Sequence, residues 1–558
     1  MLSYLKQHLL LILSILLLSP LASGMIHDPR AIEADPSSAT TAIAPRLEGL
    51  GEYGFDVTTS NPESQFFFNQ GLRLTYAFNH SEALRSFKEA VRLDPNNAMA
   101  YWGWALVLGP NLNLPMQQAV GEQAFEAAQH ALSLVDNVTD REREYIGALA
   151  ARYAPVAPNN RSALDAAYAK KMAQLTANHP DDPDAATLYA ASLMNLSPWN
   201  YWQKDGAPRA NTPAIINALS SVIERQPSHP GALHYHIHAV EAVHPKLGES
   251  SADALAPLMP GAGHMVHMPS HIYMRVGRYA DAYRVNRAAS NADSQYIAQC
   301  NAQGIYPLNY YPHNLHFLVW AAMFQGRSVE AMAGAREVQS KIPVDMEGNA
   351  FAAFETFLSQ PLYVMVRFGL WQQALDEPRP AANNQFMQGV WRYARGMAFS
   401  NTGKKQKAQR ELKQLESLIE KMPDEYFIGF GTAPKLLTIA SLVLKGDMAS
   451  NAGDFDRAIA TLSRAARIED SLLYNEPPDW YFPTRHVLGA VLLEAGYAAE
   501  AEVVYWEDLK KSPGNGFSLF GLSQSLKAQG NEPGAQLFTE KFTQAWQEAD
   551  VELESSRF

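Results

Sequence analysis

The sequence has one cysteine, Cys300, among its 558 residues. A single thiol cannot form a disulfide within the chain, so packing or a bound ligand must stabilise the fold. Basic residues are also scarce, with 45 lysines and arginines against 57 aspartates and glutamates and a net charge of -12. This balance argues against nucleic acid as a partner and against an anionic membrane surface, because both require a basic face.

Familiar catalytic motifs are absent as well. The sequence contains no His-Glu-x-x-His zinc-protease motif, no nucleophile elbow, no phosphate-binding glycine loop and no Cys-x-x-Cys pair. Alternating Val/Ile/Thr runs are missing too, so no β-rich domain is expected. A familiar enzyme class is therefore disfavoured. Whether the protein is an enzyme stays open, because side chains on several helices can still assemble a site.

Only the N-terminal segment is continuously apolar. Leu9–Leu18 is apolar apart from Ser14, Lys6 precedes it, and Pro20 and the small residues of Ala22–Gly24 follow. The run is shorter than the ~20 residues that span a bilayer. The pattern predicts a signal peptide over residues 1–24 and an exported protein, periplasmic or secreted, with no membrane span after its removal. An uncleaved anchor is the alternative.

A glycine followed five residues later by an alanine recurs through the second half of the chain. Each glycine follows an apolar helical stretch, where a left-handed residue ends a helix, and the alanine lets the next helix pack closely. These glycines are Gly277, Gly326, Gly369, Gly403, Gly453, Gly496 and Gly530. The first repeat departs from the spacing, so Asn79 is expected to take the left-handed conformation, in a surface turn that also contains His80 and Glu82.

A longer pattern places Gly71, Ala83, Phe87, Ala90 and Pro95 at steps of 12, 4, 3 and 5. This grid resembles the tetratricopeptide repeat, a helix-turn-helix unit of 34 residues. The resemblance is strong at 64–97 and 480–513, fair at 260–350, 385–420 and 435–470, and poor from 115 to 230. It implies an all-α fold, an α-solenoid of helix hairpins with a concave face. The expected parts are a signal peptide (1–24), a flexible lead-in (25–62), an N-terminal repeat-like and irregular helical region (63–230), histidine-rich repeats (231–345) and C-terminal repeats (346–558).

Ten of the 16 histidines lie between residues 229 and 316. Their spacings of three and four residues place them on single faces of helices, whereas His236 points elsewhere. Neutral imidazoles with one carboxylate suit a transition metal such as Zn, Cu or Fe. The candidate ligands are His234, His238, Glu241, His264, His267, His271, His313 and His316.

Two histidine pairs occupy equivalent positions in neighbouring repeats. His264 and His267 lie 13 and 10 residues before Gly277, and His313 and His316 lie at the same distances before Gly326. Adjacent helices pack 8–10 Å apart, so imidazoles from both can reach one point. Pro269 complicates this alignment, because it either kinks a helix or starts one.

The segments 68–80, 109–113 and 229–271 are similar to those of a group of bacterial exported tetratricopeptide-repeat proteins without a settled activity. That resemblance implies the fold and the repeat boundaries to about residue 330, and it supplies no catalytic residues. The sequence therefore predicts an exported repeat protein with a histidine-rich metal site, either a metal-binding protein or a metalloenzyme of unknown substrate. The alternative is a metal-free scaffold that binds a peptide or partner protein in the concave groove, where the histidines are core or contact residues.

Overall fold

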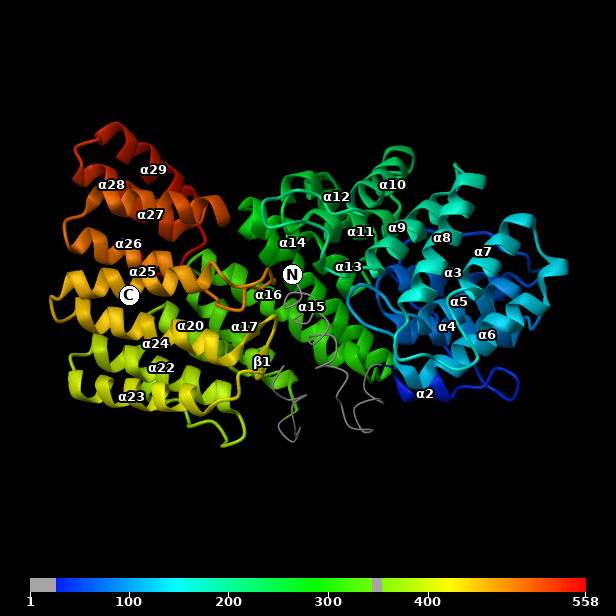
Figure 1. Cartoon of the computed structure of the whole chain (residues 1–558), viewed down its shortest axis with the longest axis horizontal. Helices are drawn as coiled ribbons and strands as arrows, with labels where there is room; N and C mark the ends of the chain where they lie inside the picture. Colours follow the sequence, from blue (N-terminus) through cyan, green and yellow to red (C-terminus); the bar gives the residue numbers. More distant parts are fainter. Residues whose placement is uncertain (1–26, 344–353) are drawn as a thin grey trace. The chain divides into compact units, whose positions relative to one another are not determined.

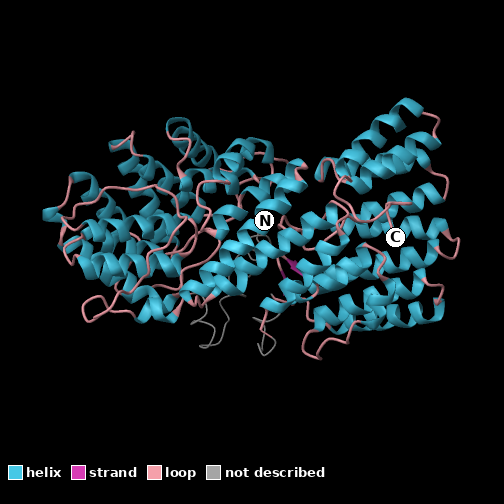
Figure 2. Cartoon of the chain, turned by 180° about the vertical axis from the view of Figure 1, so that it is seen from behind, coloured by secondary structure: helices cyan, strands magenta, loops and turns pink. Residues whose placement is uncertain are grey.

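The computed structural model describes residues 27–343 and 354–558, and their regular secondary structure is almost entirely helical (Figures 1 and 2). Their only sheet is a hairpin of β1 (Phe427–Ile428) and β2 (Gly431–Thr432). No helix in the described ranges is both long and apolar enough to cross a membrane. The predicted signal peptide, 1–24, lies outside the described residues. The fold is thus all-α, as expected.

The chain divides into two compact units. The N-terminal unit contains residues 27–272 and 288–311, and the C-terminal unit contains residues 273–287, 312–343 and 354–558. The helices of the N-terminal unit are α2 (Pro29–Glu33), α3 (Pro62–Tyr76), α4 (His80–Leu93), α5 (Ala98–Leu108), α6 (Gly121–Ser133), α7 (Asp140–Ala150), α8 (Ser162–Asn178), α9 (Pro183–Asn195), α10 (Thr212–Arg225), α11 (Pro230–Val240), α12 (Glu249–Leu255) and α13 (Gly263–His267). The unit boundary falls within α14 (Pro269–Val276) and α15 (Tyr279–Cys300).

The C-terminal unit is a solenoid of helix hairpins. Its first helices are α16 (Tyr311–Phe324), α20 (Gln360–Arg367), α22 (Gln385–Asn401), α24 (Ala433–Ser450), α26 (Thr484–Glu494) and α28 (Gly516–Ala528). Their partners are α17 (Ser328–Lys341), α21 (Trp371–Asp376), α23 (Lys405–Lys421), α25 (Phe455–Glu469), α27 (Ala498–Lys511) and α29 (Glu532–Ala545), and α19 (Glu355–Leu358) precedes α20. From α20 to α28 each first helix contacts the next, so these helices form one layer.

The turn glycines behave as predicted. All seven have positive φ, from 61° at Gly369 to 86° at Gly277. Only glycine adopts this region without steric cost, which is why the hairpins turn where the Gly-to-Ala spacing placed them. The spacing therefore located these turns correctly from sequence alone.

The first hairpin corrects one expectation. Between α3 and α4 the left-handed residue is Phe78, with φ 54°, whereas Asn79 has φ -87° and caps α4. Phe78 lies five residues before Ala83, at the place where glycine stands elsewhere. The turn is also not a surface turn, because Phe78 and Glu82 are each only 2% exposed. A bulky aromatic residue in this conformation is strained, so its surroundings must hold it there.

The predicted flexible lead-in, 25–62, has defined contacts over its described part. The buried Lys88 side chain donates to the carbonyl oxygens of Ala31, Ile32 and Ala34 at the end of α2. Further along, the backbone N–H of Ile43 donates to the Glu89 carboxylate at 2.8 Å. Residues 27–61 are thus packed against their unit, and the expectation of a freely mobile segment does not describe them.

Candidate metal centre

Helix α11 supplies the first two histidines. His229 caps its N-terminus by accepting the Ala232 N–H at 3.1 Å, and Pro230 occupies the first helical position, where its missing N–H costs nothing. The four-residue spacing then puts His234 and His238 on one face. His236 points away from them, as predicted, and its Nδ1 lies 2.9 Å from the Ser251 hydroxyl.

Helices α13 and α14 supply three more histidines. Between them Met268 keeps helical angles, φ -49° and ψ -38°, so the chain continues in a helical path and Pro269 begins α14. Pro269 thus starts a new helix without breaking the direction of the first. The result keeps His264, His267 and His271 near one another. The Nε2 atoms of His267 and His271 are 3.0 Å apart.

Three imidazoles meet between α11 and α13. Potential ligand nitrogens of His234, His238 and His264 all lie within 4.8 Å of one another. Their ring centroids are 4.8 Å apart for His234 and His238, 5.0 Å for His234 and His264, and 6.4 Å for His238 and His264. All three rings are buried, with at most 3% of each residue exposed. We call these three residues the histidine triad.

The hydrogen bonds of the triad leave several ring nitrogens without a partner. Nδ1 of His234 lies 2.6 Å from the Tyr76 carbonyl oxygen, and Nδ1 of His238 lies 3.1 Å from the Glu241 carboxylate. Both acceptors require a proton on Nδ1, which makes Nε2 of each ring an unprotonated acceptor when the ring is neutral. These two Nε2 atoms, and both ring nitrogens of His264, have no hydrogen-bond partner among the described residues.

Such atoms are rare, because a buried polar atom without a partner costs free energy. Burial lowers the pKa of His238, and it lowers the pKa values of His234 and His264 well below the usual range. Neighbouring imidazoles lower the His264 pKa further. The triad is therefore neutral at pH 7, which is the form that binds metals.

Glu241 links the triad to the second histidine pair. It is fully buried, with Oε1 3.1 Å from Nδ1 of His238 and Oε2 2.9 Å from Nδ1 of His271. Burial alone would raise the Glu241 pKa, but His271 and His238 together hold it below the usual range. An ionised carboxylate that orients histidines in this way is the common companion of metal-bound imidazole.

Aromatic side chains enclose the triad. The Phe78 ring lies 4.5 Å from that of His234 and 5.6 Å from that of His264, between centroids. Trp199 contacts His238 at 5.1 Å, and Tyr310 contacts His264 at 4.9 Å. Phe78 and Trp199 both have positive φ, and Tyr310 ends a π-helical turn, Tyr306–Tyr310, a form that often marks functional sites. Of these residues, Phe78 was not expected beside the histidines, although its position in the Gly-to-Ala spacing was a usable signal.

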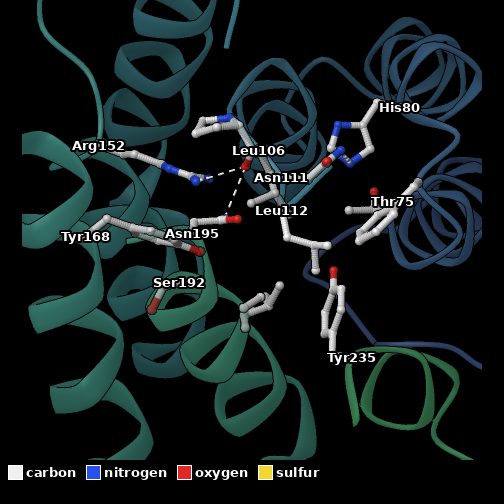
Figure 3. A pocket seen from close by; sticks show the side chains of 14 residues that line it. Thr75, His80, Leu106, Asn111, Leu112, Arg152, Tyr168, Ser192, Asn195 and Tyr235 are labelled. Carbon is white, nitrogen blue, oxygen red and sulfur yellow. Dashed lines mark hydrogen bonds between the residues drawn. The ribbon is translucent and has the colours of Figure 1, made fainter. Parts of the chain in front are cut away.

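A small cavity lies beside Phe78, on the side of α5 and α9 (Figure 3). The cavity has a volume of about 30 Å³, counted as the space that the centre of a water molecule can reach. Phe78 and Tyr235 form part of its wall. Arg152 and Asn195 both donate to the Pro110 carbonyl oxygen, at 3.0 and 3.2 Å. Phe78 thus borders both this cavity and the triad.

The remaining predicted ligands, His313 and His316, belong to the C-terminal unit. There the buried His316 ring packs against Phe357 and Tyr481, and its Nδ1 lies 3.4 Å from the Tyr481 hydroxyl. Within the N-terminal unit the structure brings together six of the eight predicted residues: His234, His238, Glu241, His264, His267 and His271. That His313 and His316 share the site stays a prediction.

No protein-family model matches the sequence, and no curated protein matches it either. Solved structures with some likeness include the human IFIT1 dimer with m7Gppp-AAAA, at 14% identity over 88% of this chain and 91% of that one, with a TM-score of 0.31. The APC/C hetero-tetramer Cut9-Hcn1 has 12% identity over 83% and 76%, with a TM-score of 0.27. Naa15/Naa10 bound to HypK-THB has 13% over 87% and 71%, with a TM-score of 0.21. Likeness this low says nothing about activity.

Proposed function

We propose that the protein is an exported helical-repeat protein that holds a transition-metal ion at the histidine triad. Two observations carry the proposal. His234, His238 and His264 each offer one ring nitrogen within 4.8 Å of the others, and each of these buried rings has at least one nitrogen without a hydrogen-bond partner among the described residues. A metal ion would bind one nitrogen of each ring, whereas a metal-free core would leave these nitrogens unpaired at a cost of about 1–3 kcal/mol each.

The surroundings fit a metal as well as the ligands do. A metal bound about 2.0–2.1 Å from each nitrogen brings tetrahedral ligand atoms to about 3.3 Å from one another, so small ring rotations suffice from the present separations. The Tyr76 carbonyl and the Glu241 carboxylate hold Nδ1 of two rings, which leaves their Nε2 atoms available to a metal. Imidazole ligands suit Zn, Cu and Fe, and three ligands leave a further coordination position open. An open position favours a reactive centre over a structural one.

Metal content tests the proposal directly. We expect the purified protein to contain about one transition-metal ion per chain by mass spectrometry, with loss on treatment with a strong chelator and recovery on adding back Zn²⁺, Cu²⁺ or Fe²⁺. The double variant His234→Ala/His238→Ala should not recover the metal. His236→Ala is the matched control, because His236 lies on the same helix and is buried but faces Ser251. Equal metal content in both variants would contradict the proposal.

The alternative function, a metal-free scaffold for a peptide or partner protein, makes the opposite prediction. In that case neither chelator nor added metal changes the thermal stability, because only a ligand of the folded chain raises it. The two functions are therefore distinguished by one melting experiment with and without metal.

A further inference from the structure

The segment that follows α29 returns across its own unit instead of leaving it. The Asp550 carboxylate accepts the backbone N–H groups of Ser328 and Val329, at 2.7 and 2.9 Å, at the start of α17. The Asp550 N–H donates to the Gly326 carbonyl oxygen at 3.1 Å. These bonds hold the segment after α29 against the start of α17, which lies more than 200 residues earlier in the sequence. Residues 552–558 then contact the first helices of the solenoid.

Arg557 enters a recess between the ends of α24 and α26. Its guanidinium donates to Asp447 at 2.6 Å, to both carboxylate oxygens of Glu494 at 2.6 and 3.0 Å, and to the Ser450 hydroxyl at 3.1 Å. Two of these acceptors are carboxylates, and the C-terminal ends of two helices add partial negative charge. The recess is therefore built for a planar cation.

The residues on either side of Arg557 have contacts of their own. The Ser556 hydroxyl, which is buried, donates to the His486 carbonyl oxygen at 2.7 Å and lies 2.7 Å from the Tyr505 hydroxyl. The Phe558 ring packs against Phe368 at the end of α20, with centroids 6.2 Å apart. Next to it Gly369 leaves room for this ring, since a Cβ there would lie 2.9 Å from Cβ of Phe558. Three consecutive side chains, small, basic and aromatic, thus occupy three distinct places.

The recess would be unfavourable without a cation. Asp447 is fully buried, and burial raises its pKa despite the adjacent guanidinium. The Asn401 and Asn451 amides donate to it at 3.2 and 3.1 Å, but they carry no charge. An ionised carboxylate left in this position without its partner is costly, so a ligand that replaces Arg557 and brings a positive charge is favoured over a neutral one, which would leave Asp447 to take up a proton.

We propose that this recess recognises a peptide of the pattern small-Arg-aromatic in a partner protein, and that residues 552–558 occupy it as an internal ligand which the partner displaces. The internal segment has a high effective concentration because it is tethered, so it competes strongly with a free peptide. The surface is formed by the first helices α20, α24 and α26 with the turn after α20. It is independent of the histidine triad, so either assignment can fail without the other.

A peptide-binding measurement on the full chain tests this assignment. The probe is a fluorescein-labelled synthetic peptide of residues 552–558, followed by fluorescence anisotropy. The variant Arg557→Gln weakens the internal segment, and we expect this chain to bind the probe at least about tenfold more tightly than the unaltered chain, the value of one charge-assisted hydrogen bond. A matched probe with glutamine in place of the arginine should bind neither chain.

A second variant keeps the test decisive if Arg557→Gln fails to fold. Phe558→Ala removes only the aromatic contact and leaves Asp447 paired, and it should also admit the probe more readily than the unaltered chain. If folded variants, verified by circular dichroism, bind the probe no better than the unaltered chain, residues 552–558 are an intramolecular brace only. Equal binding of the arginine and glutamine probes would likewise overturn the proposal.

Discussion

Acid should destabilise the metal-free N-terminal unit through the histidine triad. Burial holds the pKa values of His234 and His264 well below the usual value, so both rings are neutral in the folded protein. In the unfolded chain each ring has a pKa of about 6.5 and gains a proton as the pH falls below that value. The unfolded state then binds more protons than the folded state, so the free energy of unfolding falls with falling pH. This contribution is complete above about pH 7.5 and is lost progressively below pH 6.5.

The size of the effect follows from the same linkage. At pH 5.5, one unit below the pKa of histidine in the unfolded chain, each ring that stays neutral in the folded protein lowers the free energy of unfolding by about 1.4 kcal/mol. His234 and His264 together lower it by about 3 kcal/mol. Urea unfolding in the presence of a chelator, followed by tryptophan fluorescence and fitted with one transition for each unit, measures the loss between pH 7.5 and 5.5. The total loss should exceed that of the two rings, because burial also lowers the pKa values of His27, His80 and His236, to about 4, 3 and 4. The two rings contribute no change between pH 7.5 and 8.5; the buried Lys88, whose pKa burial lowers to about 8, is the group that titrates there.

A variant assigns the effect to one residue. His264→Gln removes one titrating ring, and the loss of stability between pH 7.5 and 5.5 should shrink by about 1.4 kcal/mol relative to the unaltered chain. The absolute stability of the variant does not matter for this comparison, because only the pH-dependent difference is used. If the variant loses as much stability as the unaltered chain, His264 is protonated in the folded protein and the burial argument is wrong.

Three further predictions concern single side chains. Glu241→Gln should weaken metal binding by about 10–100-fold in a competition titration, because an amide cannot accept from both imidazoles that the carboxylate orients; unchanged affinity would mean that Glu241 does not support the site. Phe78→Ala should lower the free energy of unfolding by about 3–5 kcal/mol and speed metal loss to a chelator, because Phe78 borders both the cavity and the triad and its removal would open space between them; equal rates of metal loss would show that the ring is no barrier. Gly403→Ala should cost about 1 kcal/mol through positive φ alone, since nothing lies within 4 Å of the added Cβ, whereas Gly277→Ala should cost more, because its Cβ would lie 2.4 Å from the Pro513 carbonyl oxygen. Thermal unfolding of the two glycine variants checks the order, and equal costs would contradict it.

Much of the fold was predictable because its signals are local. A left-handed glycine ends a helix wherever it stands, so the Gly-to-Ala spacing located every predicted turn, from Gly277 to Gly530. The same spacing, applied strictly, would have placed Phe78 at the first turn in place of Asn79. A positive φ at Phe78 could not be predicted from the local sequence, because an aromatic residue is held in this strained conformation only by tertiary contacts.

The site was predictable in part for the same reason. Helical spacing alone pairs His234 with His238, and it separates His236 from them. The approach of α13 to α11, however, depends on tertiary packing that the local sequence does not determine. The same holds for the Tyr76 carbonyl, which orients His234 from a helix more than 150 residues earlier. The aromatic enclosure by Trp199 and Tyr310 depends on loop and π-helical geometry that the sequence does not signal.

The most direct test of a metal centre at the histidine triad is X-ray absorption spectroscopy at the metal edge of the protein loaded with one equivalent of Zn²⁺ or Cu²⁺. A metal ion at the triad should have three imidazole nitrogens at about 2.0–2.1 Å, and this signature should be lost in His234→Ala/His238→Ala but not in His236→Ala. A first shell made of oxygen atoms, or a spectrum identical in the two variants, would contradict a metal centre at His234, His238 and His264.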